Sequence, residues 1–219
     1  MATPSIYYQD DLVTLYHGDC REVIAWLDAD VLVSDVPYGI DYRSNKASAM
    51  ARSIDGDLDT STRDEALALW GSKPALVFGS WQRPRPAGTK MLLVWDTKGA
   101  LGMGDTSLPW KPSHQEIYVL GRGFEGRRTT DVLVCAPVQS MQKNGRYHPH
   151  EKPVTLMGEL VRKCPPGVIA DPFAGSGSTL IAAKIEGRRA IGVEVTEAHC
   201  ETAAKRLSSS QDALFGGVA

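Results

Sequence analysis

One segment, Val-Ile-Ala-Asp-Pro-Phe-Ala-Gly-Ser-Gly-Ser-Thr at positions 168–179, constrains the fold more than any other part of the chain. It predicts a short buried strand, a turn containing Gly175 and Gly177, and the start of a helix. A glycine turn between a parallel strand and a helix lets backbone N–H groups approach a ligand, because no side chain intervenes. The segment therefore predicts an α/β protein with a ligand site at this turn.

Strand and helix patterns alternate along the rest of the chain. The predicted strands are 12–16, 30–34, 75–78, 91–95, 116–120, 131–135, 168–170 and 190–193, and the predicted helices are 21–27, 63–70, 153–164, 179–185 and 196–207. Strands such as 30–34 and 91–95 are continuous apolar runs, which is typical of a sheet covered on both faces. We expect a mostly parallel sheet with helices on both faces. A long loop over 39–62, an irregular segment over 99–113 and a frayed tail over the last twelve residues complete the prediction.

Composition indicates one globular domain over 1–219, since 42% of its residues are hydrophobic and 23% are charged. No apolar run approaches the roughly 20 residues that span a bilayer, and the N-terminus has no signal-peptide pattern. We therefore expect a cytoplasmic protein without a membrane partner. The four cysteines, at 20, 135, 164 and 200, are far apart in sequence, so no metal site is expected.

The net charge of −2 argues against broad, nonspecific coating of nucleic acid. Segment 121–147 differs from the average, with a net charge of +3 from five basic and two acidic residues. The basic residues are Arg122, Arg127, Arg128, Lys143 and Arg146. Such a run is equally consistent with an ordinary solvated surface.

The glycine turn is not of the mononucleotide or dinucleotide type. It lacks the Gly-Lys-Ser/Thr of a phosphate-binding loop, and Leu180 stands where a third glycine would complete the dinucleotide pattern. Glu194 ends the next predicted strand, where an acid could accept hydrogen bonds from both ribose hydroxyls. Asp171 could pair with an ammonium group. Partners for a ribose and an ammonium without pyrophosphate machinery favour S-adenosylmethionine as the cofactor.

Three segments together resemble the signature motifs of amino-group DNA methyltransferases. They are Ser-Asp-Val-Pro-Tyr-Gly at 34–39, His-Pro-His-Glu-Lys-Pro at 148–153 and Asp-Pro-Phe-Ala-Gly-Ser-Gly-Ser-Thr at 171–179. Their order, with the target-amine motif first, is similar to the permuted beta group. The turn at 18–19 and the segment 110–116 are also similar, so the resemblance covers most of 12–207.

The resemblance implies which residues hold S-adenosylmethionine. The segment beginning at Asp171 would wrap the methionine part, Glu194 would hold the ribose, and Asp19 would lie by the adenine ring. The segment 148–153, with Lys152, would close over the cofactor. The complete cofactor assignment is Asp19, Lys152, Asp171, Phe173, Ala174, Gly175, Ser176, Gly177 and Glu194.

The catalytic assignment is Asp35, Val36, Pro37 and Tyr38. An exocyclic amine is a poor nucleophile because its lone pair is delocalised into the ring. Asp35 and the Val36 carbonyl could accept hydrogen bonds from it and favour the pyramidal geometry, while Tyr38 stacks on the extruded base. The family usually has proline where this chain has Val36. Losing that fixed φ predicts a more mobile loop and slower turnover.

Aspartate at position 35 favours adenine N6 as the target, by resemblance, with cytosine N4 as the alternative. A C5-cytosine mechanism needs a cysteine nucleophile, and no Pro-Cys pair occurs. Two further alternatives remain: a catalytically silent subunit that binds cofactor or DNA, and a methyltransferase acting on RNA or on protein glutamine.

DNA is the expected partner, with 121–147 as a small target-recognition segment and Arg43 and Lys46 near phosphates. So small a segment suggests a short target or a homodimer that pools two surfaces. A compact methylase of this kind would suit a bacterium or a phage-infected cell. A restriction nuclease, if one exists, would be a separate protein.

Overall fold

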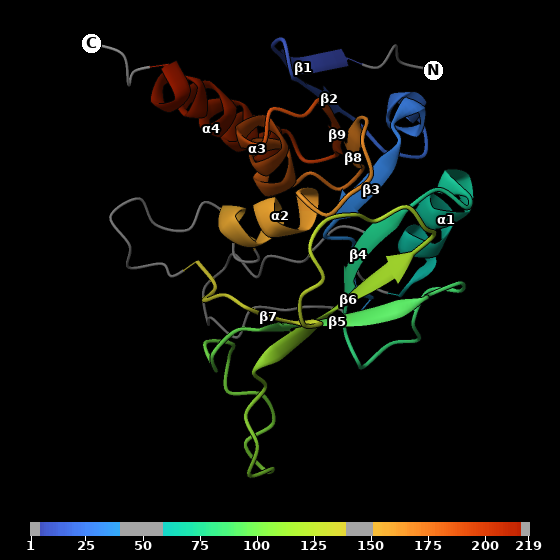
Figure 1. The fold of residues 1–219 in the computed structure, drawn as a ribbon, viewed down its shortest axis with the longest axis vertical. Coiled ribbons are helices and arrows are strands. Elements are labelled where there is room, and N and C mark those ends of the chain that lie inside the picture. The colour runs from blue at the N-terminus through green and yellow to red at the C-terminus, as the bar shows by residue number, and fades with distance from the viewer. Residues whose placement is uncertain (1–4, 40–58, 139–150, 216–219) are drawn as a thin grey trace.

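The computed structural model describes residues 5–39, 59–138 and 151–215, with side chains to residue 209 (Figure 1). All strands in this part of the chain belong to one nine-stranded sheet in the order β1-β2-β9-β8-β3-β4-β6-β5-β7. They are β1 (Ser5–Gln9), β2 (Val13–His17), β3 (Val31–Ser34), β4 (Ala75–Gly79), β5 (Met91–Asp96), β6 (His114–Leu120), β7 (Val132–Val134), β8 (Ile169–Asp171) and β9 (Ala190–Glu194).

The middle of the sheet is parallel, as predicted. Strands β2, β9, β8, β3 and β4 run in the same direction, whereas β1 pairs antiparallel with β2, and β6 pairs antiparallel with both β4 and β5. From β8 the chain proceeds to β9 on one side, and from β3 it proceeds to β4 on the other. Such a reversal opens a crevice at the carboxyl ends of the two central strands, where ligands of α/β sheets bind.

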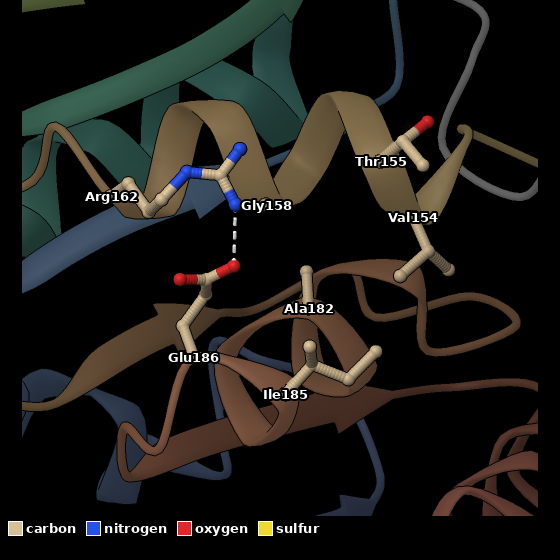
Figure 2. A pocket seen from close by; sticks show the side chains of 7 residues that line it. All are labelled: Val154, Thr155, Gly158, Arg162, Ala182, Ile185 and Glu186. Carbon is tan, nitrogen blue, oxygen red and sulfur yellow. Dashed lines mark hydrogen bonds and ion pairs between the residues drawn. The ribbon is translucent and has the colours of Figure 1, made fainter. Parts of the chain in front are cut away.

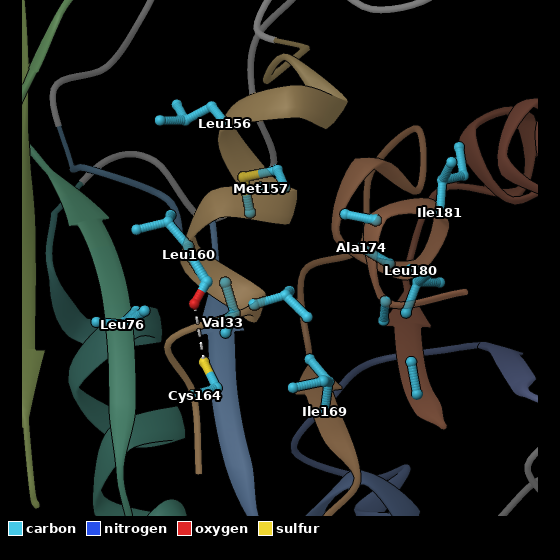
Figure 3. Packing of buried hydrophobic residues seen from close by; sticks show 14 of the residues in the cluster. Val33, Leu76, Leu156, Met157, Leu160, Cys164, Ile169, Ala174, Leu180 and Ile181 are labelled. Atoms are coloured by element: carbon cyan, nitrogen blue, oxygen red, sulfur yellow. Dashed lines mark hydrogen bonds between the residues drawn. The ribbon is translucent and has the colours of Figure 1, made fainter. Parts of the chain in front are cut away.

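Helices cover both faces of the sheet. The helices α2 (Val154–Val161), α3 (Ser178–Ile185) and α4 (Glu197–Phe215) pack on one face, and α1 (Ser61–Trp70) and the 3₁₀ helix η1 (Ile24–Asp28) pack on the other. Successive strand residues point to opposite faces. Val33 therefore joins Leu156 and Leu160 of α2 (Figure 3), while its neighbour Leu32 joins Trp26 and Trp70.

Three sequence predictions were wrong in detail. Segment 21–27 forms a turn and a 3₁₀ helix over Ile24–Asp28, not an α-helix. Strand β5 is not buried, since only Trp95 is enclosed, because β5 lies beyond the helical layers near an edge of the sheet. Helix α4 continues to Phe215, so residues 208–215 are helical rather than a frayed tail.

Other predictions concern the long loops and the membrane and metal expectations. The irregular segment 99–113 is confirmed, and Figure 1 shows it projecting from the sheet between β5 and β6. Most of the predicted loop 39–62 lies outside the described residues. No helix in the described ranges is long and apolar enough to cross a membrane. Within the same ranges, no cluster of three His, Cys, Asp or Glu side chains could hold a metal ion.

Candidate active site

Four acidic residues lie at the carboxyl ends of four neighbouring parallel strands. Asp19 follows β2, Glu194 ends β9, Asp171 ends β8 and Asp35 follows β3. Because parallel strands end at the same edge of a sheet, about 4.8 Å apart, these acids form a row across the strand reversal. The fold thus brings together the N-terminal and C-terminal motifs that were identified in the sequence.

Asp171 and Ser34 join the two sides of the reversal. The Ser34 hydroxyl donates to Asp171 Oδ1 at 2.6 Å, and the Phe173 N–H donates to the same oxygen at 3.2 Å. Burial raises the pKa of Asp171 to about 6, and hydrogen bonds from Ser34 and Thr179 offset only part of this increase. Since these donors are uncharged, an arriving cation would stabilise the ionised form.

The turn after β8 depends on two glycines. Gly175 has φ +51° and Gly177 has φ +82°, the left-handed region in which glycine is favoured. A Cβ on Gly192 of β9 would lie 2.6 Å from a Leu180 methyl group, so this glycine lets α3 approach the sheet. The third glycine of the dinucleotide pattern is thus replaced by a glycine on the neighbouring strand.

Glu194 fixes the turn through backbone hydrogen bonds. One carboxylate oxygen accepts from the Gly175 N–H at 2.8 Å, and the other accepts from the Thr196 N–H at 2.8 Å and lies 3.3 Å from His199 Nδ1. Burial acts to raise the pKa of Glu194, but these hydrogen bonds outweigh it and hold the pKa below its usual value. Lone pairs remain on both oxygens for hydroxyl donors.

Asp19 lies beside Glu194 because the Gly18 N–H donates to the Glu194 backbone carbonyl at 2.9 Å. Its carboxylate forms an ion pair with Arg21 at 2.5 Å, and the hydrogen bonds from Arg21 lower its pKa. The Asp19 side chain is 30% exposed, so it remains accessible to a ligand at this edge.

Asp35 is held by side chains. Its Oδ1 accepts from the Tyr38 hydroxyl at 2.7 Å, and its Oδ2 pairs with Lys152 Nζ at 2.5 Å. The Tyr38 hydroxyl also lies 3.3 Å from Gln115 Oε1. A quarter of the Asp35 side chain is exposed, whereas Lys152 is buried with its ammonium 5.0 Å from the Phe78 ring. The structure thus places Lys152 on the acid of the target-amine motif, and its cofactor role stays a prediction.

The segment after Asp35 is anchored by packing. Val36 is 3% exposed and belongs to the apolar cluster of Trp26 and Val23, and Pro37 is also buried. This packing restrains the backbone at the position where the family pattern has the first of its two prolines.

The basic residues Arg122, Arg127 and Arg128, which the structure describes, do not lie at this edge. The last residue of β6, Leu120, pairs with Ala75, the first residue of β4, so Arg122 emerges at the opposite edge from Asp35. The Arg127 carbonyl accepts from Lys163 Nζ at 2.7 Å, beyond α2. Arg122, Arg127 and Arg128 are exposed. Arg43, Lys46, Lys143 and Arg146 lie outside the described residues.

Sequence reasoning missed two residues of the site. Ser34 is fully buried, and a polar residue ending an apolar strand was a usable signal. Arg206 of α4 donates to the Ser176 carbonyl at 2.6 Å in the glycine turn. No local pattern distinguishes it from a solvated helix residue, because its partner is 30 positions away.

A groove lies between α2 and α3 (Figure 2). It is lined by Val154, Thr155, Gly158, Arg162, Ala182, Ile185 and Glu186, and Arg162 pairs with Glu186 at 2.6 Å across it. None of the predicted site residues lines this groove.

A mostly parallel sheet with a glycine turn and a row of acids at its strand reversal defines the methyltransferase class of α/β folds. Residues 82–205 match the family model N6_N4_Mtase, described as DNA methylase, and the chain belongs to this family of N6/N4 DNA methylases.

Known proteins agree with this assignment. The chain is 29% identical to the candidate methylase YubD of Escherichia coli (strain K12) over 219 aligned positions, which cover 92% of this chain and 93% of YubD. M1.HpyAVI, solved with SAM, superposes with a TM-score of 0.65 at 17% identity, covering 90% of this chain and 99% of that one. The cytosine-N4-specific PvuII DNA methyltransferase gives 0.66 at 14% identity, covering 98% and 96%.

Proposed function

We propose that this protein transfers a methyl group from S-adenosylmethionine to the N6 amine of adenine in DNA. The observation that carries the proposal is the junction at the strand reversal. There the Ser34–Asp171 hydrogen bond of 2.6 Å joins the cofactor-type turn to the segment that presents Asp35. A methyl donor at the turn would thus lie next to an acceptor for an amine.

The residues of the turn fit S-adenosylmethionine. Asp171 offers a buried carboxylate with uncharged donors, which suits the cofactor's ammonium group. Glu194 is ionised and fixed by backbone N–H groups, which suits the ribose hydroxyls. The relative M1.HpyAVI was solved with this cofactor. The cofactor supplies a methyl group on a positively charged sulfur. Asp35 and the Val36 carbonyl act on the amine.

Asp35 accepts a hydrogen bond from the target amine, and the Val36 carbonyl accepts a second one. Together they would hold the amine in the geometry needed for attack, so orientation supplies most of the catalysis. Each Asp35 oxygen has one side-chain donor, Tyr38 on Oδ1 and Lys152 on Oδ2, so lone pairs remain for the amine. The surplus proton leaves the amine after methyl transfer, so no strong base is required beforehand.

Cytosine N4 is the second candidate target, since the N4-specific PvuII enzyme has a similar fold. The intact Asp35 constellation disfavours a silent subunit. We also propose that the basic segment 121–147 contacts DNA and that two copies of the chain form a homodimer.

Nucleoside mass spectrometry tests the proposal. Unmethylated DNA is incubated with the protein and S-adenosylmethionine, with the Asp35→Ala variant as the control. N6-methyladenine with the wild type alone is the expected result. N4-methylcytosine would retain the mechanism and change the base, whereas no methylated base with cofactor bound would contradict the proposal.

A further inference from the structure

Arg206 contacts two separate segments from a position in α4. Its Nη1 donates to the Ser176 carbonyl at 2.6 Å and to the Ser176 hydroxyl at 2.9 Å, and its Nη2 pairs with Glu151 at 2.7 Å. The Arg206 side chain is 10% exposed and that of Glu151 is 5% exposed. Burying an ion pair this completely is costly, and the cost is offset only when its geometry and hydrogen bonds are good.

The residue after Glu151 is Lys152, which pairs with Asp35. Two adjacent residues are thus anchored in the two halves of the site: Glu151 to the cofactor turn through Arg206, and Lys152 to the catalytic acid. A continuous line of contacts runs from Ser176 through Arg206, Glu151 and Lys152 to Asp35.

We propose that Arg206 is a positioning residue that sets the location of Lys152, and therefore of the Asp35 carboxylate, relative to the cofactor turn. This inference rests on the proposed function, because it concerns the acid assigned to the target amine. The Lys152 side chain is only 5% exposed, so it has little freedom and the position of its ammonium depends on where its backbone is held. Arg206 holds that backbone through Glu151 and holds the turn through Ser176.

A second buried ion pair in the same region provides a matched control. Lys184 of α3 pairs with Asp10 at 2.6 Å, donates to the Leu207 carbonyl at 2.9 Å, and is 4% exposed. It fastens the N-terminal strands to the helices and contacts no residue of the proposed site. Lys184→Met should therefore cost stability as Arg206→Met does, without moving Lys152.

The test compares Arg206→Met, Glu151→Gln and Lys184→Met by three measurements: methyl transfer at saturating substrates, cofactor affinity, and labelling of Lys152 by an amine-reactive reagent followed by peptide mass spectrometry.

We expect kcat to fall about 10- to 100-fold in Arg206→Met and Glu151→Gln, the effect of misplacing a catalytic group by about 1 Å. Lys152 should be labelled about tenfold faster in both of them. Only Arg206→Met should also weaken cofactor binding, since Glu151→Gln leaves the Ser176 contacts in place. Arg206→Lys, which keeps the charge facing Glu151, should recover part of kcat.

Lys184→Met should keep kcat within about twofold of the wild-type value and leave Lys152 protected from labelling. We expect this even if the melting temperature of Lys184→Met falls as far as that of Arg206→Met. The inference is overturned if Lys152 stays protected from labelling in both Arg206→Met and Glu151→Gln. It is also overturned if kcat falls in Lys184→Met by as much as in the other two variants at the same loss of melting temperature. The labelling needs no turnover. A wild type that methylates nothing would therefore refute the proposed function, while the labelling would still decide whether Arg206 positions Lys152.

Discussion

The two halves of the site hold their carboxylates in different ways. Glu194 accepts from the backbone N–H groups of Gly175 and Thr196, so it cannot move unless the turn moves. Asp35 is held by the side chains of Tyr38 and Lys152 rather than by backbone N–H groups. The proposed cofactor half is therefore fixed by the backbone, whereas the position of the proposed catalytic acid depends on two side chains.

The strongest test of this difference removes Asp35, the acid that is held by side chains. Asp35→Ala should lower methyl transfer about 100- to 1,000-fold, because the amine loses its charged acceptor. Cofactor affinity, measured by calorimetry, should stay the same. Glu194 and Asp171 are held by hydrogen bonds that do not involve Asp35. Asp11→Ala, on the exposed turn between β1 and β2, serves as the control. Full activity in Asp35→Ala would remove this residue from the mechanism.

Removing the fixed acid should have the converse effect. Glu194→Ala is expected to weaken cofactor binding about 10- to 100-fold, since it deletes hydrogen bonds to a charged group and leaves the N–H groups of Gly175 in the turn and of Thr196 after β9 without their acceptor. Activity at saturating cofactor should fall much less. Glu201→Ala, on the exposed face of α4, should change neither quantity. An unchanged dissociation constant in Glu194→Ala would contradict the ribose assignment.

Asp171 sharpens the comparison through pH. Its native pKa of about 6 lies above the unfolded value of about 4, so between these pH values the native state binds more protons. Stability contributed by this group is therefore present at low pH and lost as pH rises to about 6. The cost of the buried charge, about 3 kcal/mol, should be complete above that pH.

Asp171→Asn should accordingly raise the melting temperature at pH 7.5 and change it little at pH 4, while weakening cofactor binding. Asp19→Asn is the control of opposite sign, because hydrogen bonds from Arg21 lower the pKa of Asp19. Equal shifts of the Asp171→Asn melting temperature at both pH values would show that its charge carries no such cost.

The smallest effect is expected at Val36. Because packing already restrains this residue, Val36→Pro should change kcat by no more than about fivefold. Val36→Ala should be worse, since it removes the buried methyl groups that anchor the segment. A large gain in activity in Val36→Pro would instead support the prediction that valine at position 36 makes this loop mobile and slows turnover.

The central strands and the glycine turn were predictable because they depend on local patterns: unbroken apolar runs, and glycines at positions of positive φ. Strand β1 was not predicted, since Ser5–Gln9 is half-exposed and gains its order from pairing with β2. The row of acids followed from strand ends in a parallel sheet. The pairing of Lys152 with Asp35 could not be foreseen, because 117 positions separate them and only the tertiary fold joins them.

Ser34 and Asp171 meet across 137 positions of the chain, and this separation has a consequence during synthesis. A ribosome adding about 5–20 residues per second makes the segment proposed to bind the amine on the order of 10 s before the proposed cofactor turn exists. Until β8 docks beside β3, the crevice at the strand reversal has not formed and the sheet is incomplete. A chain interrupted before β8 therefore lacks the junction between the two halves of the proposed site, whatever it has folded until then.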